Sequence, residues 1–231
     1  MLTVTILAKN AAQTLAGTLD SCRLFPEVLL FDTGSTDATL EIARAYPNVR
    51  IVKHPFIGFG PCHNAAAKEA RYDWILSLDS DEVLSEALVQ EILSLSLHPK
   101  QVYAIHRCNY FHNQRIRCCS GWYPDWNIRL FCRTTTSFTD DLVHETVRSQ
   151  ALSIVRLQGK MYHTPYLSIE HLLQKISSLS KAIGHGIGAF LKNYFLKRGF
   201  LGGKEGFIIS LYNAQCSYYK YLKLAWRNNS L

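Results

Sequence analysis

The sequence predicts an α/β fold in which a mostly parallel sheet is flanked by helices and followed by a helical extension. In the first half, short apolar runs alternate with helical stretches of about 10–15 residues, which is typical of parallel strands buried on both faces. After Pro165 the apolar residues recur at three- and four-residue steps, which is the period of a helix. The chain has 231 residues, of which 48% are hydrophobic, so it can bury a core and is too apolar to be disordered.

The elements can be read in chain order. The predicted strands cover residues 2–8, 28–32, 49–54, 74–79 and 102–107, and the predicted helices cover 11–22, 38–46, 62–71 and 83–97. Between Cys108 and Tyr162 the pattern changes to short, aromatic-rich strands such as 126–131. A helical face then follows, made of Leu172, Leu173, Ile176, Leu179, Ile183, Ile187 and Phe190, and a last helix is predicted over 205–227. We therefore expect a catalytic domain over 1–165 and a helical extension over 166–231.

Charge is divided unevenly along the chain. The net charge of +7 comes from residues 151–231, which carry +9, whereas residues 1–150 carry −2. Such an asymmetry indicates an anionic partner, which is a membrane surface, a nucleic acid or a phosphorylated substrate. The basic residues after Pro165 are interleaved with aromatic ones, which favours an anionic membrane surface over nucleic acid. The alternative is a helical cap packed on the core, with a solvated basic face.

The seven cysteines form no CxxC pair, so free thiols are expected instead of a disulfide scaffold or a zinc site. Lys9 interrupts the N-terminal apolar run too early for a signal peptide. The longest uncharged stretch of the extension, Gly206 to Tyr219, is too short and polar to span a bilayer. We expect a cytoplasmic protein that associates with the inner membrane peripherally.

Polar clusters follow three of the predicted strands, at 9–10, 32–37 and 79–82. Ligands of open α/β sheets bind outside the carboxyl ends of the strands, so these clusters are expected to converge on one site. Asp79 and Asp81 are two residues apart in extended backbone, and their carboxylates can therefore address one point. Mg²⁺ or Mn²⁺ is commonly held by one or two such carboxylates together with substrate phosphates. A solvated surface turn is the alternative.

Taken together, the ordered motifs resemble a known family. They are DTGSTD at 32–37, GFGPCHNA at 58–65, WILSLDSDE at 74–82, GWYPDWNIRLF at 121–131, VHE at 143–145, MYH at 161–163 and RGFLGGKEGF at 198–207. This set is similar to glycosyltransferases of family 2, which have the Rossmann-like GT-A fold. It looks most like the small lipopolysaccharide inner-core β-1,4-glucosyltransferases of bacteria. The resemblance covers nearly the whole chain and is far more specific than its DxD motif alone.

The resemblance implies roles for residues on the donor side. Asn10 and Asp32 would contact the nucleotide, with Asp32 on the base. Asp79 would reach the ribose and the metal, and Asp81 would bind the metal and the diphosphate. Ala11 and Ala12 depart from the family, which usually has an acidic residue there.

A base must also remove the proton of the acceptor hydroxyl, because a neutral alcohol is a weak nucleophile. Glu145 is the first candidate by resemblance, Asp125 the second, and Asp140 or Asp141 the third. Each could equally be an ordinary loop acid.

Two further residues of the pattern have two interpretations each. By resemblance to GT-A enzymes, His163 would reach the metal or the diphosphate, or it is a satisfied core histidine. Arg129 either grips a phosphate or forms a salt bridge inside the sheet.

The resemblance thus implies an inverting, metal-dependent transferase that moves a hexose from a UDP-sugar, and the resemblance to glucosyltransferases implies that this hexose is glucose. The acceptor would be a lipopolysaccharide precursor or a related membrane-held glycolipid. A haloacid-dehalogenase-type phosphatase is an alternative, because residues 79–83 fit its DxDx[TV] pattern. A non-enzymatic binder of membranes or nucleic acid leaves the clustered acids unexplained. Dinucleotide binding is weaker still, because the Gly58–Gly60 pair lacks a third glycine.

Overall fold

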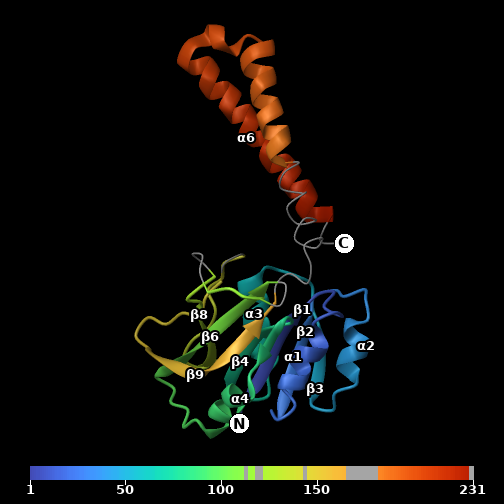
Figure 1. Cartoon of the computed structure of the whole chain (residues 1–231), viewed down its shortest axis with the longest axis vertical. Coiled ribbons are helices and arrows are strands. Elements are labelled where there is room, and N and C mark those ends of the chain that lie inside the picture. The colour runs from blue at the N-terminus through green and yellow to red at the C-terminus, as the bar shows by residue number, and fades with distance from the viewer. Residues whose placement is uncertain (112–113, 118–121, 143–144, 165–181, 229–231) are drawn as a thin grey trace. The chain divides into compact units, whose positions relative to one another are not determined.

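The computed structural model describes residues 1–111, 114–117, 122–142, 145–164 and 182–228 of the chain. The chain divides into two compact units, Met1–Pro165 and Tyr166–Leu231, each of which is described by itself (Figure 1).

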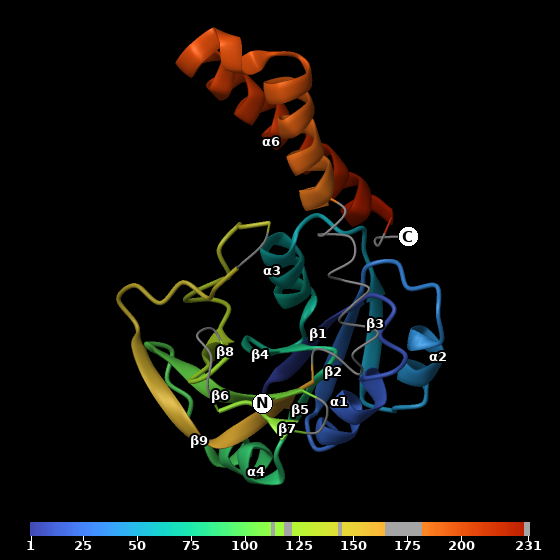
Figure 2. The same ribbon diagram turned by 45° about the horizontal axis from the view of Figure 1, so that its top comes forward.

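The first unit is built on a nine-stranded sheet with the order β3-β2-β1-β4-β8-β6-β9-β5, and β7 pairs with β6. The strands are β1 (Thr3–Ala8), β2 (Glu27–Asp32), β3 (Val49–Lys53), β4 (Trp74–Asp79), β5 (Glu82–Leu84), β6 (Gln101–Phe111), β7 (Gln114–Arg115), β8 (Trp126–Cys132) and β9 (Ser153–His163). The first four strands of the order are parallel, and β8 is antiparallel to both β4 and β6. β6 and β9 therefore run in the same direction as β4, side by side (Figure 2). The carboxyl ends of β1, β2, β4, β6 and β9 consequently lie along one edge of the sheet.

Four helices cover the two faces of this sheet: α1 (Leu15–Ser21), α2 (Thr39–Arg44), α3 (Phe59–Glu69) and α4 (Glu86–Ser94). β2 is buried on both faces, as its uninterrupted apolar run predicts. Val28 and Leu30 pack in the main core with residues of α1 and α4, whereas Leu29 and Phe31 pack with Cys62 of α3. The expected arrangement of a sheet between helical layers is confirmed.

Two local expectations were wrong. The helix predicted from 83 begins at Glu86, because Ser85 caps it by accepting a hydrogen bond from the N–H of Leu88 at 3.2 Å, and Val83 instead pairs with β9. The second concerns β9: only short strands were expected up to Tyr162, and β9 has eleven residues. A Cβ on Gly159 of β9 would collide with the backbone of Leu88, so a glycine is needed where α4 crosses this strand.

The second unit is a helical hairpin. A helix over 182–191 continues into the π-helical turn η1 (Lys192–Leu196), the 3₁₀ corner η2 (Gly199–Gly202) and the long helix α6 (Gly203–Asn228), which returns alongside it (Figure 1). Most of the apolar face predicted over 172–190 lies outside the described residues. Within the described part of the chain, no helix is both long and apolar enough to cross a membrane. Five cysteines are described there, and all five are free thiols.

Candidate active site

Two loops at the carboxyl edge of the sheet, after β1 and β2, are tied together by hydrogen bonds. Asn10 adopts a left-handed conformation (φ 52°), and its Oδ1 accepts a hydrogen bond from the backbone N–H of Thr36 at 2.8 Å. The buried Asp32 carboxylate accepts hydrogen bonds from the N–H groups of Gly34 and Ser35 at 3.2 and 3.1 Å. The two residues expected on the nucleotide side therefore belong to one ordered corner of the sheet edge.

A network of four charged side chains lies at the end of β4. Arg129 of β8 places Nη2 2.7 Å from Oδ2 of Asp79 and 2.5 Å from Oε1 of Glu82. Arg107 of β6 lies 3.1 Å from the same Glu82 oxygen and 3.9 Å from Oδ2 of Asp79. The other Glu82 oxygen accepts the backbone N–H of Asp79 at 3.0 Å. Two arginines from neighbouring strands thus neutralise two carboxylates at the site.

Arg129 controls the ionisation of both acids. Burial raises the pKa of Glu82, against the opposing charge of Arg129. Burial acts in the same sense on Asp79, but the Arg129 guanidinium outweighs it and holds the pKa of Asp79 below its usual range. The Asp79 side chain is still 37% exposed, so it remains accessible to a ligand. Of the two interpretations of Arg129 from sequence, the geometry shows the salt bridge inside the sheet.

Asp125, the second candidate for the base, is held by three side-chain donors. Its carboxylate accepts hydrogen bonds from Nε of Arg107 at 2.7 Å, Nδ2 of Asn109 at 2.9 Å and Nδ2 of Asn127 at 2.7 Å. Burial raises the pKa of Asp125, but these bonds and the Arg107 charge outweigh it, and the net shift is downward. A carboxylate stabilised in this way is a weak proton acceptor.

Asp81 and His163 come together at the same edge, from the β4–β5 turn and the end of β9. Oδ2 of Asp81 lies 3.5 Å from Nε2 of His163. The other ring nitrogen, Nδ1, lies 2.6 Å from Oδ1 of Asn109, which is an acceptor because Nδ2 of Asn109 donates to Asp125 and to the carbonyl oxygen of Trp122. Nδ1 therefore carries a hydrogen and donates it to Asn109, which fixes the ring so that Nε2 faces Asp81.

Glu145, the first candidate for the base, lies beside a buried histidine of α3. Its Oε1 is 3.7 Å from Nε2 of His63, and Nδ1 of His63 is 3.2 Å from Oγ of Ser77 on β4. The His63 ring stacks on Phe138 with centroids 4.5 Å apart. Burial lowers the pKa of His63 to about 4, so the ring is neutral at pH 7. Glu145 thus lies beside a neutral imidazole, whereas Asp125 is held by one arginine and two asparagines.

The third candidates lie nearby on the loop before Glu145. Asp140 is exposed and pairs with Arg148 at 2.9 Å. Asp141 accepts the backbone N–H of Gly60 through its main-chain carbonyl, at 3.1 Å. Neither contact distinguishes them from ordinary loop acids.

Sequence reasoning missed four residues that shape the site: Glu82, Arg107, Asn109 and His63. Glu82 and His63 belong to two of the motifs given above, so their place near the site could be predicted from sequence. The side chains that they contact could not. The contacts of Arg107 and Asn109 depend on β6 lying beside β8 and β9, which the prediction did not contain.

Comparison with known proteins decides the family. The family model described as glycosyl transferase family 2 matches residues 3–153. The chain belongs to glycosyl transferase family 2. An uncharacterised glycosyltransferase of Rickettsia typhi (strain ATCC VR-144 / Wilmington) is 27% identical over 248 residues, which cover 95% of this chain and 85% of the relative. The lipopolysaccharide core biosynthesis glycosyltransferase LpsC of Rhizobium meliloti (strain 1021) is 26% identical over 98 residues, covering 39% of this chain and 36% of LpsC.

The fold of this glycosyltransferase resembles that of a solved structure. TarS of S. aureus (1–349), in complex with UDP-GlcNAc, superposes with a TM-score of 0.53 at 13% identity, covering 99% of this chain and 92% of that one. The expected GT-A fold with a C-terminal helical extension is confirmed. The phosphatase interpretation of residues 79–83 was wrong, because these residues lie within the part of the chain that the glycosyl transferase family 2 model matches.

Proposed function

We propose that this glycosyltransferase moves a glucosyl residue from UDP-glucose to a lipopolysaccharide core or a related membrane-held glycolipid, with inversion at the anomeric carbon. A uridine nucleotide is supported by the fold shared with TarS, which is described in complexes with UDP-GlcNAc and with UDP. The acceptor class is supported by the similarity to LpsC over part of the chain. Asn10 and Asp32 face the nucleotide side in this proposal, at the corner of the loops after β1 and β2.

A divalent cation, Mg²⁺ or Mn²⁺, fits the residues at the end of β4. No three His, Cys, Asp or Glu side chains among the described residues lie close enough to hold a metal ion by themselves. Asp81 and His163 supply two ligands that face each other, and Asp79, two residues before Asp81, is 37% exposed. Mg²⁺ commonly takes one or two protein ligands and completes its shell with substrate phosphates and water, so this donor set suits an ion shared with the donor's diphosphate. When bound, such an ion stabilises the charge that develops on the leaving diphosphate.

The chain's own residues prepare and assist the transfer. Arg129 holds the Asp79 carboxylate ionised and in place. Asn109 orients the ring of His163 so that Nε2 faces Asp81. Glu145 is the base that accepts the proton of the acceptor hydroxyl, because Asp125 is already engaged by three donors that lower its pKa.

The basic extension, residues 166–231, associates with an anionic membrane surface in this proposal. It contains nine Lys and Arg against Glu170 and Glu205, a net charge of +7, whereas residues 1–165 contain sixteen basic and sixteen acidic residues. The whole excess positive charge of the enzyme therefore lies in the extension, where it can gather the enzyme onto the surface that carries its acceptor.

The observation that carries the catalytic proposal is the Asp81–His163 pair at the carboxyl edge of the sheet. The test is calorimetric titration with UDP, UDP-glucose and GDP-mannose, with and without Mn²⁺, for the wild type and Asp81→Asn. We expect Mn²⁺-dependent binding of the uridine nucleotides that Asp81→Asn weakens. Metal-independent binding, or full transfer activity in excess EDTA, would reject the metal role, and tighter binding of GDP-mannose would reject the donor.

A further inference from the structure

The corner of the C-terminal hairpin exposes apolar side chains to an unusual degree. Leu196 is 82% exposed and Leu201 is 71% exposed, and Phe195 and Phe200, which precede them directly in the sequence, are also exposed. Monomeric soluble proteins rarely show contiguous apolar surface of this kind unless it is an interaction site. We name residues 192–204 the hairpin tip.

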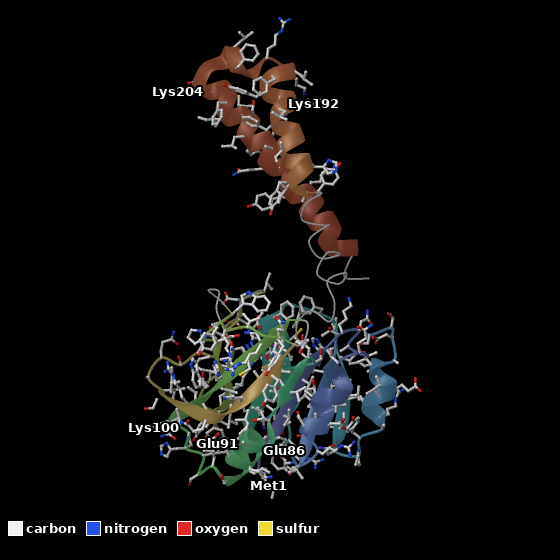
Figure 3. All side chains as sticks on the ribbon, viewed as in Figure 1. Met1, Glu86, Glu91, Lys100, Lys192 and Lys204 are labelled. Carbon is white, nitrogen blue, oxygen red and sulfur yellow. The ribbon has the colours of Figure 1, made fainter. Side chains whose placement is uncertain are left out.

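All the charged residues of the hairpin tip are basic. Lys192, Lys197, Arg198 and Lys204 lie within its thirteen residues, and no acidic residue does. Lys192 and Lys204 lie at the same end of the hairpin, on its two arms (Figure 3). The apolar and basic side chains therefore occupy one end of this unit together.

The tip has a defined shape, built by glycines of the RGFLGGKEGF motif at 198–207. A Cβ on Gly206 would collide with the carbonyl group of Gly199. A Cβ on Gly199 would lie 2.8 Å from the carbonyl oxygen of Asn193 and 2.8 Å from Oγ of Ser210. The two arms approach this closely only because both positions lack a side chain. In the corner that this close contact forms, Leu196 and Leu201 are exposed to solvent. Leucine side chains are usually buried in folded proteins.

We propose that the hairpin tip inserts into an anionic lipid bilayer, with Leu196, Phe200 and Leu201 among the acyl chains and the four basic residues at the phosphates. Apolar and aromatic side chains ringed by Lys and Arg match the layered chemistry of such a surface, because long basic side chains extend to the headgroups while their neighbours bury. A second copy of this chain fits less well, since it would bring two sets of four uncompensated cations together. This inference deepens the proposed membrane association and assigns it to particular residues.

The test compares matched pairs of exposed leucines. Leu196→Ser/Leu201→Ser removes apolar surface from the tip, and Leu24→Ser/Leu93→Ser removes it from exposed positions of the first unit. Co-flotation is measured with vesicles of phosphatidylethanolamine and phosphatidylglycerol, at low and high salt, with phosphatidylcholine vesicles as the neutral reference. We expect the full-length enzyme to bind the anionic vesicles, more weakly at high salt. The tip variant should lose at least about tenfold in partition coefficient, and the control variant should not change.

A second measurement reports insertion directly. Tryptophan is placed at one position in the otherwise wild-type chain, in Leu201→Trp and in Leu24→Trp, and quenching by brominated lipids is compared with that of the native tryptophans. We expect additional quenching for Leu201→Trp alone. Circular dichroism of each variant verifies that the helices are retained.

The outcomes separate this inference from the wider proposal. Vesicle binding by the wild type that the tip variant retains would overturn insertion of the tip and leave membrane association standing. No binding by the wild type would overturn both, without bearing on nucleotide binding or transfer activity. A dimer in analytical ultracentrifugation that the tip variant dissolves would assign the surface to a second copy. Leu201→Trp shielded from acrylamide without lipid would assign it to contacts within the enzyme. Either result would reject the bilayer.

Discussion

Arg129→Met tests the ion network at the end of β4 most directly. The substitution keeps much of the length of the side chain and removes the guanidinium that lies nearer to both Asp79 and Glu82. Arg107 remains, but it lies 3.1 Å from Glu82 and 3.9 Å from Asp79, so it cannot compensate both carboxylates equally. Two acids are then left at one site with a single cation.

The size of the expected loss of stability follows from the burial of Arg129 and Glu82, whose side chains are 8% and 0% exposed. Removing one partner of a buried ion pair costs about 3–5 kcal/mol, because the remaining charge is left uncompensated. Domains of this kind are stable by about 5–15 kcal/mol, so the loss is large and the variant can still fold. Glu82→Gln in the Arg129→Met background removes one of the two orphaned charges and should recover much of the loss.

The loss must also depend on pH, with a defined sign. In the wild type the pKa of Asp79 is lowered, which contributes stability above the unfolded pKa, and this contribution disappears as the pH falls through the folded value. In the variant, the pKa of Glu82, already raised by burial, rises further. A carboxyl whose folded pKa lies above its unfolded pKa destabilises the fold increasingly as the pH rises. The difference between wild type and variant should therefore be larger at about pH 8 than at about pH 5.

Urea unfolding followed by tryptophan fluorescence measures this difference at the two pH values. Arg23→Met is the matched control, since it breaks an exposed pair with Asp20 on α1 and should change stability little. A loss in Arg129→Met no larger than in Arg23→Met, or one that is equal at both pH values, would refute the electrostatic reasoning.

Three further predictions concern the site and the sheet. Glu145→Gln should lower kcat by roughly 10²–10⁴-fold with little change in UDP affinity, as measured by steady-state kinetics and by titration with UDP. If Glu145→Gln stays active, Glu145 is not the base. Asn109→Leu should weaken Mn²⁺ binding about 10–100-fold in calorimetry with UDP present, because it frees the ring of His163; unchanged affinity contradicts the role of Asn109 in orienting that ring. Gly159→Ala should lower the free energy of unfolding by about 1–3 kcal/mol in urea titrations, since its Cβ meets the backbone of Leu88. Gly184→Ala, whose Cβ would meet nothing within 4 Å, is its control, and equal stability of the two would rule out the collision.

The strands that the sequence predicted well are the short apolar runs β1 to β4, whose predicted ends agree with the structure to within one residue. β1, β2 and β4 are largely buried on both faces, and β3, at the edge of the sheet, is half-buried. β9 alternates instead: Leu157 and Met161 are buried, and the residues between them are mostly charged or polar and face outward. Such a half-polar strand resembles a loop in composition, and only its pairing with β6 and β5 reveals it.

The same limit applies to the site. Asp79 and Asp81 could be placed at the same edge of the sheet from sequence, because both stand at the end of a single strand. The partners of Asp125 could not, since Arg107 is 18 residues away in sequence and Asn109 is 16 away. Their contacts exist because β8 runs antiparallel between β4 and β6, and no local pattern encodes that order.

This network changes how a loss of activity at Asp125 must be interpreted. Asp125 binds Arg107 and Asn109, and Asn109 in turn binds His163, so Asp125→Asn will disturb the metal side of the site even if Asp125 never touches the acceptor. A base that is removed abolishes the acidic limb of the pH–rate profile. A positioning residue that is removed lowers Mn²⁺ affinity and leaves that limb in place. A slow Asp125→Asn enzyme that keeps its acidic limb, beside a Glu145→Gln enzyme that has lost it, would establish Glu145 as the base and Asp125 as a residue that positions Asn109 and His163.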